Sequence, residues 1–199
     1  MTDVAFVPAP LGLLHQYRSQ VDPLADVRAA VRAAAVWLHD RSQELVVVTG
    51  PARAGDPTDR PATPPGLRIA RELLAALPPL PVTEIVVGPG VTVPPPGPRR
   101  GVLVVADGSA RRSLRAPGHL DERAVPFDDD IEAALLSGDP ARFAALDAGL
   151  ADELLCAAVP VLAGVADALA GGRASTVHLD LSADPFGVQY WVARWADVS

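Results

Sequence analysis

The first half of the chain alternates short apolar runs with segments of helical periodicity. Four of the runs are apolar without polar alternation, which is typical of buried strands: residues 4–7, 44–49, 84–87 and 101–106. Apolar residues at helical spacing predict helices over 23–39 and 67–77, the first preceded by Asp22, a suitable capping residue. Strand and helix in alternation favour a mostly parallel sheet with helices on both faces.

The second half changes character after Pro126. Its periodicity predicts three helices, over 127–136, 140–146 and 150–170, the last around Pro160. Two strands follow, over 176–181 and 188–195, and the last is rich in aromatic residues. We therefore expect one domain over residues 1–199 with a three-layer α/β fold, and the aromatic strand suggests the seam of a homodimer.

Composition narrows the class of protein. The formal charge is −7 over 199 residues, which argues against a nucleic-acid partner, because such proteins need a positive surface. The lone Cys156 excludes an intramolecular disulfide. The N-terminus lacks a basic region and a long apolar region, and the apolar stretch 154–170 is interrupted, so we expect neither signal peptide nor membrane span. A cytoplasmic location is the expectation.

Ligands of open α/β sheets bind beyond the carboxyl ends of the strands. The loops expected there are residues 8–10, 50–53, 88–90 and 107–110. The second of these begins a long stretch, 50–66, rich in Pro, Gly, Asp and Thr, and long loops in compact domains are usually functional or disordered. We therefore expect the site in this crevice.

Several motifs along the chain resemble those of one family. Ala5-Phe6-Val7-Pro8-Ala9-Pro10-Leu11 resembles an opening that typically reads Val-Pro-His-Pro, and residues 46–52 resemble a second strand ending in Pro-His. Residues 127–156 are similar to a following helical region, and 184–190 to a closing Asp-Pro-Phe-Gly-Val-Gly-Tyr. The family is the LigB-like class III extradiol dioxygenase superfamily, which includes Memo-like proteins. The chain most resembles a branch without the metal-binding histidines.

The resemblance implies a non-haem iron site in the active members, held by histidines at the first two strand ends and a third protein ligand. Ala9 and Ala52 stand at the two histidine positions, and a methyl group donates no lone pair. Residues 156–161 resemble the Memo-like Cys-Gly-Arg-His-Pro-Ile, whose cysteine lies at a metal site, and Asp107 matches an aspartate before a pocket histidine. We expect no metal ligands and no cofactor; iron(II) or zinc enters only if the protein is an enzyme.

Five residues remain as candidates for the site. His119 is a candidate general base and Cys156 a candidate nucleophile or ligand, although surface exposure and core packing respectively explain them as well. Asp107 and Ser109 are candidates to bind a small polar molecule, with Arg111 as an anchor for an anion; the alternative is a tight turn. The run 128–130 is expected to place negative charge at a helix N-terminus.

These observations lead to a hypothesis with two alternatives. We expect a non-catalytic or divergent LigB-like protein that binds a small molecule or a protein partner in the strand-end crevice. The first alternative is a divergent enzyme, an extradiol dioxygenase-like metal-dependent oxygenase or a hydrolase, which uses Asp107, His119 or Cys156. The second is a purely structural subunit.

Overall fold

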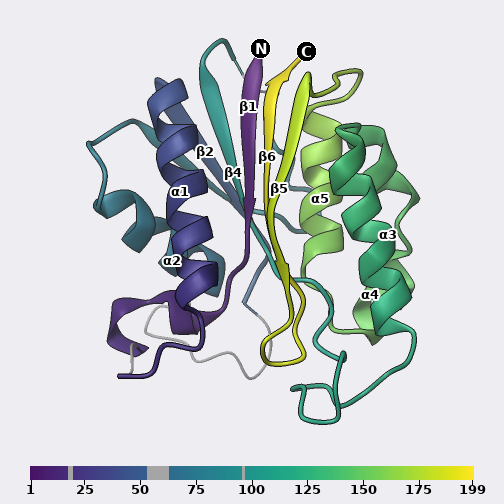
Figure 1. The fold of residues 1–199 in the computed structure, drawn as a ribbon. Helices are drawn as coiled ribbons and strands as arrows, with labels where there is room; N and C mark the ends of the chain where they lie inside the picture. The colour runs from purple at the N-terminus through teal and green to yellow at the C-terminus, as the bar shows by residue number, and fades with distance from the viewer. Residues whose placement is uncertain (18–19, 53–62, 96) are drawn as a thin grey trace.

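The computed structural model describes residues 1–17, 20–52, 63–95 and 97–199. One six-stranded sheet lies between two layers of helices (Figure 1). The elements follow in chain order: β1 (Thr2–Val7), η1 (Leu11–Leu13), η2 (His15–Tyr17), α1 (Ala25–Arg41), β2 (Glu44–Thr49), α2 (Pro65–Ala75), β3 (Val82–Val86), β4 (Arg100–Val105), α3 (Ala124–Ser137), η3 (Pro140–Ala145), α4 (Ala148–Glu153), α5 (Ala158–Ala168), β5 (Thr176–Ala183) and β6 (Tyr190–Val198).

The sheet is mostly parallel, as its apolar strands predict. Its strand order is β3-β2-β4-β1-β6-β5, and the first four strands run in the same direction. β6 pairs with β1 antiparallel and β5 pairs with β6 antiparallel. The interior strands β1, β2 and β4 are buried on both faces, which explains the unbroken runs of valine and leucine in β2 and β4 and the apolar residues 4–7 of β1. The three-layer α/β expectation is confirmed.

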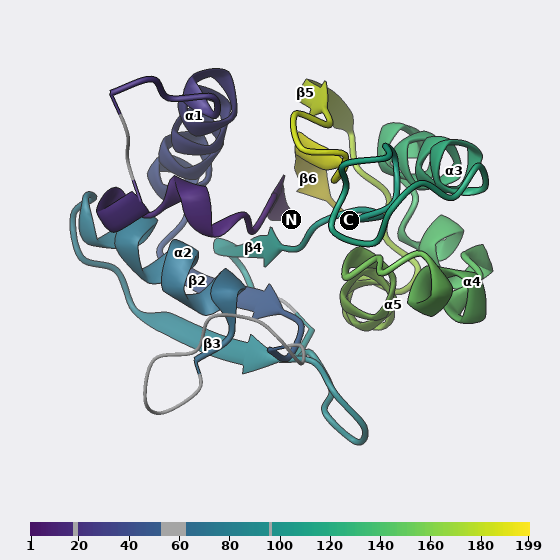
Figure 2. The same cartoon turned by 90° about the horizontal axis from the view of Figure 1, so that it is seen from below.

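Each face of the sheet carries its own hydrophobic core. α1 and α2 cover one face, where α1 buries Val27, Val31, Ala34 and Leu38 along one side. α3, α4 and α5 lie on the opposite side, where a second core includes residues of β1, β4 and β6 (Figure 2). Trp195 of β6 stacks on Phe143 in this second core, with ring centroids 5.3 Å apart. The sheet therefore separates two chemically similar but independent interiors.

Two helix predictions need correction. α1 begins at Ala25, and Asp22 caps the turn before it by accepting the Leu24 N–H at 3.0 Å. The single helix expected over 150–170 is two helices, α4 and α5, because the chain turns between them at Leu155, whose φ is 55°. Much of the long loop expected over 50–66 lies outside the described residues, and α2 already begins at Pro65.

The aromatic residues of the last strand do not lie on the surface. β6 is an interior strand between β1 and β5, and Tyr190, Trp191 and Trp195 are all buried. The expected dimer seam along these side chains is therefore wrong, because the two cores already cover them. Whether copies of the chain associate through another surface stays a prediction.

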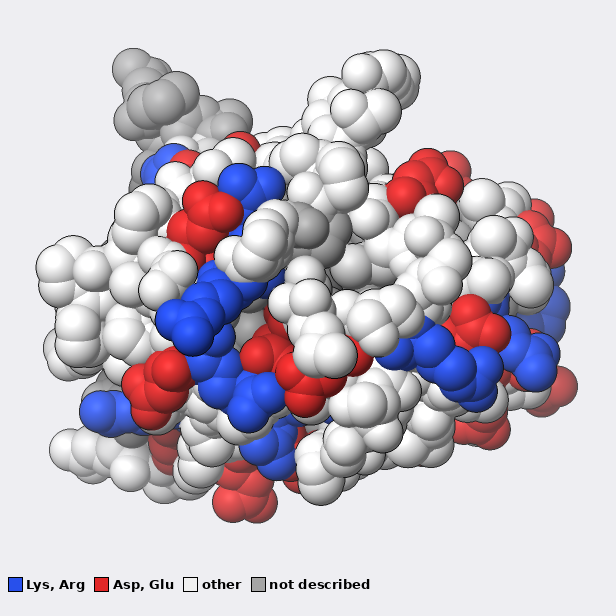
Figure 3. Space-filling view, turned by 90° about the horizontal axis from the view of Figure 1, so that it is seen from above, with Lys and Arg blue, Asp and Glu red and all other residues white. Residues whose placement is uncertain are grey.

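The face at the amino ends of the parallel strands carries charges of both signs side by side (Figure 3). Arg41, the last residue of α1, donates to Asp3 of β1 at 2.8 Å and lies 3.4 Å from Asp197 of β6. Asp3 also accepts the Asp197 N–H at 2.9 Å. These contacts fasten the end of α1 to β1 and β6.

Among the helices of the described residues, none combines the length and the apolar character that crossing a membrane requires.

Candidate functional site

β1 and β4 lie side by side and parallel, and the chain leaves them toward opposite faces of the sheet. After β1 it passes to α1, and after β4 it passes to α3. Such a switch point opens a crevice at the carboxyl ends of the strands, where α/β proteins bind ligands. The two departing loops are joined there, because the carboxylate of Asp107 accepts the Ala9 N–H at 2.6 Å.

The loop after β4 is extended and pairs with the start of β6. Gly108 donates its N–H to Gln189 O at 2.8 Å, and Gln189 donates to Ser109 O at 3.0 Å. A Cβ on Gly108 would lie 2.7 Å from both Gln189 Cβ and the Trp191 ring. Only glycine fits this close approach, so the segment is a bridge between two strands rather than the tight turn considered from sequence.

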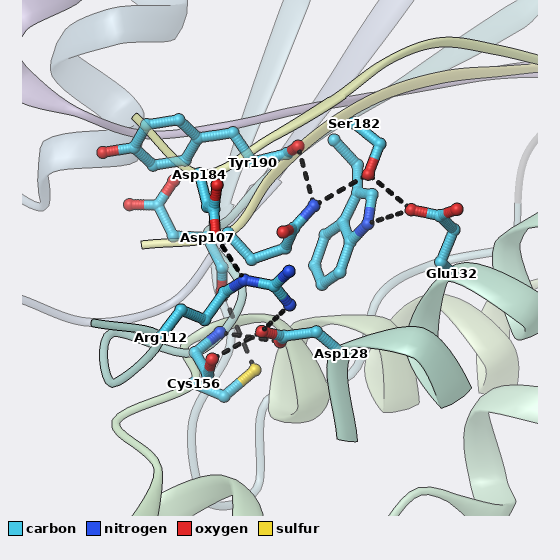
Figure 4. A network of polar contacts seen from close by, with 11 residues as sticks. Asp107, Arg112, Asp128, Glu132, Cys156, Ser182, Asp184 and Tyr190 are labelled. Carbon is cyan, nitrogen blue, oxygen red and sulfur yellow. Dashed lines mark hydrogen bonds and ion pairs between the residues drawn. The ribbon is translucent and has the colours of Figure 1, made fainter. Parts of the chain in front are cut away.

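Tyr190 is the second polar residue of the crevice. Its side chain is 3% exposed, and burial together with the nearby negative charge of Asp107 raises the pKa of the phenol. The hydroxyl therefore stays protonated and is a hydrogen-bond donor near neutral pH. No hydrogen bond joins this hydroxyl to any residue that the structure describes. Figure 4 shows the tyrosine beside the aspartate.

Cys156 lies behind Asp107, at the break between α4 and α5. Its side chain is 1% exposed, and its Sγ lies 3.8 Å from the backbone oxygen of Asp107. The structure thus brings two sequence candidates together. The thiol donates to a carbonyl oxygen in that contact and packs in the core of the α3–α5 face.

Ser109 turns away from the crevice into a buried ionic cluster. Asp128 of α3 accepts the Ser109 N–H at 2.9 Å and its Oγ–H at 2.5 Å, and Arg112 Nη1 lies 3.2 Å from the same carboxylate. Arg112 also contacts Asp184 of the β5–β6 turn at 2.8 Å. Burial raises the pKa of Asp128, although Ser109 and Arg112 favour its charged form.

Sequence reasoning did not identify Asp128 as a residue of this network. The run 128–130 was expected to supply negative charge to a helix N-terminus, yet only Asp128 of the three is buried. Its position is the inward-facing one of α3, next to Phe127 and one turn before Ile131. The helical spacing of those apolar neighbours is the sequence feature that could have indicated the burial of Asp128.

A second network links α3 to the β5–β6 hairpin (Figure 4). Glu132 accepts from Ser182 Oγ at 2.5 Å and from the Trp191 Nε1–H at 3.1 Å. Gln189 then donates from Nε2 to Ser182 Oγ at 2.9 Å. These contacts satisfy the polar groups at the start of β6, and they fasten the hairpin to α3.

His119 and Arg111 belong to the loop between β4 and α3, and the structure does not place either with Asp107 and Tyr190. His119 is exposed, with a left-handed φ of 58°. Arg111 packs against Gly118, where a Cβ would lie 2.7 Å from Arg111 Cγ. Its Nε is the one buried side-chain N or O atom within the described ranges that has no hydrogen-bond partner.

This loop is fastened by Asp121. Its N–H donates to Arg111 O at 2.9 Å, and hydrogen bonds from Arg123 lower the pKa of its carboxyl to about 2. The carboxylate therefore stays charged through the neutral range, and its hydrogen bonds with Arg123 tie this loop to the residue before α3.

The residues at the strand ends do not fit the iron site that the family resemblance implies. Ala9 and Ala52, both partly buried, offer no lone pair, Asp107 Oδ1 already accepts the Ala9 N–H, and Cys156 Sγ contacts a backbone oxygen. Within the described ranges, no three His, Cys, Asp or Glu side chains form a group that could hold a metal ion.

Comparisons with known proteins show similarity to solved structures. No protein-family model matches the sequence, and no curated protein matches it significantly. A solved structure titled as an uncharacterized protein from Escherichia coli K12 is similar over 98% of this chain and 99% of its own, with 15% sequence identity and a TM-score of 0.45. A likeness at that level says nothing about function.

Proposed function

We propose that this protein is a non-catalytic binding protein, a divergent relative of the LigB-like fold, that takes a small polar molecule in its strand-end crevice. The observation that supports the proposal is the pairing of Asp107 with Tyr190. A carboxylate and a protonated phenol stand together at the switch point between β1 and β4, and the phenol has no hydrogen bond to the described residues. A cytoplasmic location belongs to the same proposal.

The chemistry of this pair defines the ligand. Asp107 accepts hydrogen bonds and Tyr190 donates one, so the best partner carries a donor and an acceptor on neighbouring atoms. Alcohols and primary amides meet that requirement. An anionic ligand would be repelled by the carboxylate, which disfavours acids and phosphates at this position.

The residues at the neighbouring strand ends are small. Ala9 and Ala52 stand where the resemblance would put imidazole rings, and Gly50 follows β2 at the same edge. Small side chains at these positions support a neutral ligand rather than a metal ion held by imidazoles.

The test is a calorimetric titration of the wild-type protein with a panel of small amides, diols, amines and carboxylates. We expect amides or diols to bind and carboxylates not to bind. Asp107→Asn and Tyr190→Phe should each weaken that binding about tenfold or more, because each removes one of the two groups proposed to hydrogen-bond the ligand. Each variant is first checked by its urea unfolding curve, since Asp107 also holds the Ala9 N–H.

Two matched variants control for the chemistry of the substitutions. Tyr17→Phe removes an exposed phenol from η2, and Asp167→Asn removes an exposed carboxylate from α5. Neither should change the affinity. Binding that survives both Asp107→Asn and Tyr190→Phe in folded protein would show that the ligand lies elsewhere and would overturn the proposal.

The enzyme alternative receives less support from the geometry. A thiol nucleophile must be accessible to its substrate, but Cys156 is 1% exposed and packs in the core of the α3–α5 face. His119, the candidate base, is exposed on the loop before α3. Catalysis by these residues stays a prediction that an activity assay must test.

A further inference from the structure

A second cavity lies away from the strand-end crevice, between α1 and α2. It has a volume of about 130 Å³. α1 contributes Val31 and Ala35, α2 contributes Ile69 and Leu73, and the segment after η1 closes one end with Leu14. Figure 2 shows these helices and the η1 segment on the same face of the sheet.

The spacing of the lining residues explains why the cavity exists. Each helix turns one side toward it, at positions 28, 31, 32 and 35 of α1 and at 69, 72, 73 and 76 along α2 and its C-cap. Alanine at 35 and 76 leaves the gap open, since a larger side chain at either position would fill it.

Two charged side chains at the edge of the cavity, Arg28 and Glu72, have hydrogen-bond partners in the protein and form part of the cavity wall. Arg28 donates to Gly12 O at 2.9 Å, to Leu13 O and to Asp22 at 3.0 Å. Glu72 accepts the His15 N–H at 2.7 Å. Together these contacts hold the η1–η2 segment across one end, so the cavity keeps its shape without a ligand.

Arg32 also lines the cavity, and it differs from these two. It is exposed, and no hydrogen bond or ion pair joins it to any part of the chain that the structure describes. A guanidinium beside an apolar hollow matches a ligand with an apolar body and an acidic head.

The size of the hollow limits the ligand further. An apolar cavity of roughly 150 Å³ in another protein accommodates one benzene molecule. Sites for drug-sized ligands are larger, about 300–1,000 Å³. A single six-membered ring matches the volume of this hollow.

We propose that the α1–α2 cavity binds a small cyclic monocarboxylate, with its ring among Val31, Ile69 and Leu73 and its carboxylate on Arg32. The site is independent of the strand-end crevice and differs from it in the charge of its ligand, which is an anion here and a neutral molecule in the crevice. An acid is excluded beside Asp107 and is favoured here.

The experiment titrates ¹⁵N-labelled protein with benzoate and with benzyl alcohol, its uncharged analogue of similar size. Benzoate should shift the amide signals of α1 and α2, with a dissociation constant on the order of 0.1–1 mM for so small a ligand. Arg32→Gln should weaken benzoate binding roughly three- to tenfold and leave benzyl alcohol unchanged. Ala76→Leu should weaken both, because the larger side chain enters the hollow.

Arg142→Gln is the matched control, since it removes an exposed arginine from η3, on the opposite side of the sheet. It should leave both titrations as in the wild type. Three results would overturn the proposal: signals that shift only around the crevice, equal binding of benzoate before and after Arg32→Gln, and no shifts with either compound at millimolar concentration.

Discussion

Asp128 is the residue whose burial has the largest expected energetic consequence. Its side chain is 1% exposed and accepts two hydrogen bonds from Ser109 and one from Arg112. A buried carboxylate is costly on its own, and its partners become costly when it is removed. The cluster therefore specifies how the β4–α3 loop packs on α3, more than it adds to stability.

At this scale we predict that Asp128→Ala lowers the free energy of unfolding by about 3 kcal/mol, because the Ser109 amide and the Arg112 guanidinium lose a buried acceptor. The measurement is urea denaturation followed by circular dichroism. Asp129→Ala, an exposed neighbour on the same helix, is the control and should change stability by no more than about 0.5 kcal/mol. Equal effects of the two substitutions would contradict the assigned role of Asp128.

Among the elements, the β5–β6 hairpin depends most on side-chain contacts outside the sheet. β5 is an edge strand that pairs only with β6, and its exposed positions alternate with half-buried ones. Glu132 supplies the link to α3 through Ser182 and Trp191. The hairpin is thus held at two places. Glu132 of α3 binds Ser182 and Trp191, and Arg112 binds Asp184 in the turn.

Replacement of Glu132 by alanine should cost about 1–2 kcal/mol, since the buried Trp191 N–H is left without its acceptor. Amide hydrogen exchange of β5 should accelerate more than that of β2, because the change is local to the hairpin. Asp130→Ala, on the exposed side of the same helix, should leave both rates unchanged. Uniform acceleration in both strands would instead indicate a global loss of stability.

The elements that sequence predicted well are those whose signal is local. β2 coincides with its expected bounds because the Leu45–Val48 run is apolar and β-branched, and a buried parallel strand requires that pattern. The break at Leu155 was missed since Ala, Leu and Val continue across it, and the turn depends on tertiary packing. Pairing of Tyr190 with Asp107 was likewise invisible, because it depends on β6 lying next to β1.

The same distinction between local and long-range features applies to the candidate site. Asp107 was found from its position after a strand, which is a local feature, and it does lie at the switch point. Ser109 carries the same local signal, yet it faces Asp128, because the direction of its side chain is set by the pairing of the loop with β6. The position of Asp107 at the end of β4 was predictable from sequence, whereas the direction of the Ser109 side chain was not.

For the molecule as a whole, the two alanines at the strand ends predict how the protein responds to metal. Protein incubated with iron(II) should retain less than stoichiometric iron after desalting, and it should not open the ring of catechol, because Ala9 and Ala52 provide no imidazole. Metal analysis and the absorbance of the ring-opened product are the measurements. Stoichiometric iron, or turnover abolished by Cys156→Ser, would favour the enzyme alternative.

The position of β6 has a consequence for how the chain folds. β1 pairs on one side with β4 and on the other with β6, so Thr2 lies opposite Val198. The sheet can be completed only when segments at the two ends of the sequence meet, and such distant contacts are slow to form because a long loop must close. We expect β1 to β4 to assemble first, with the β5–β6 hairpin joining last. β6 also carries Tyr190, so a chain arrested before that step would have β1 to β4 in place and would lack the phenol that we propose to bind the ligand beside Asp107.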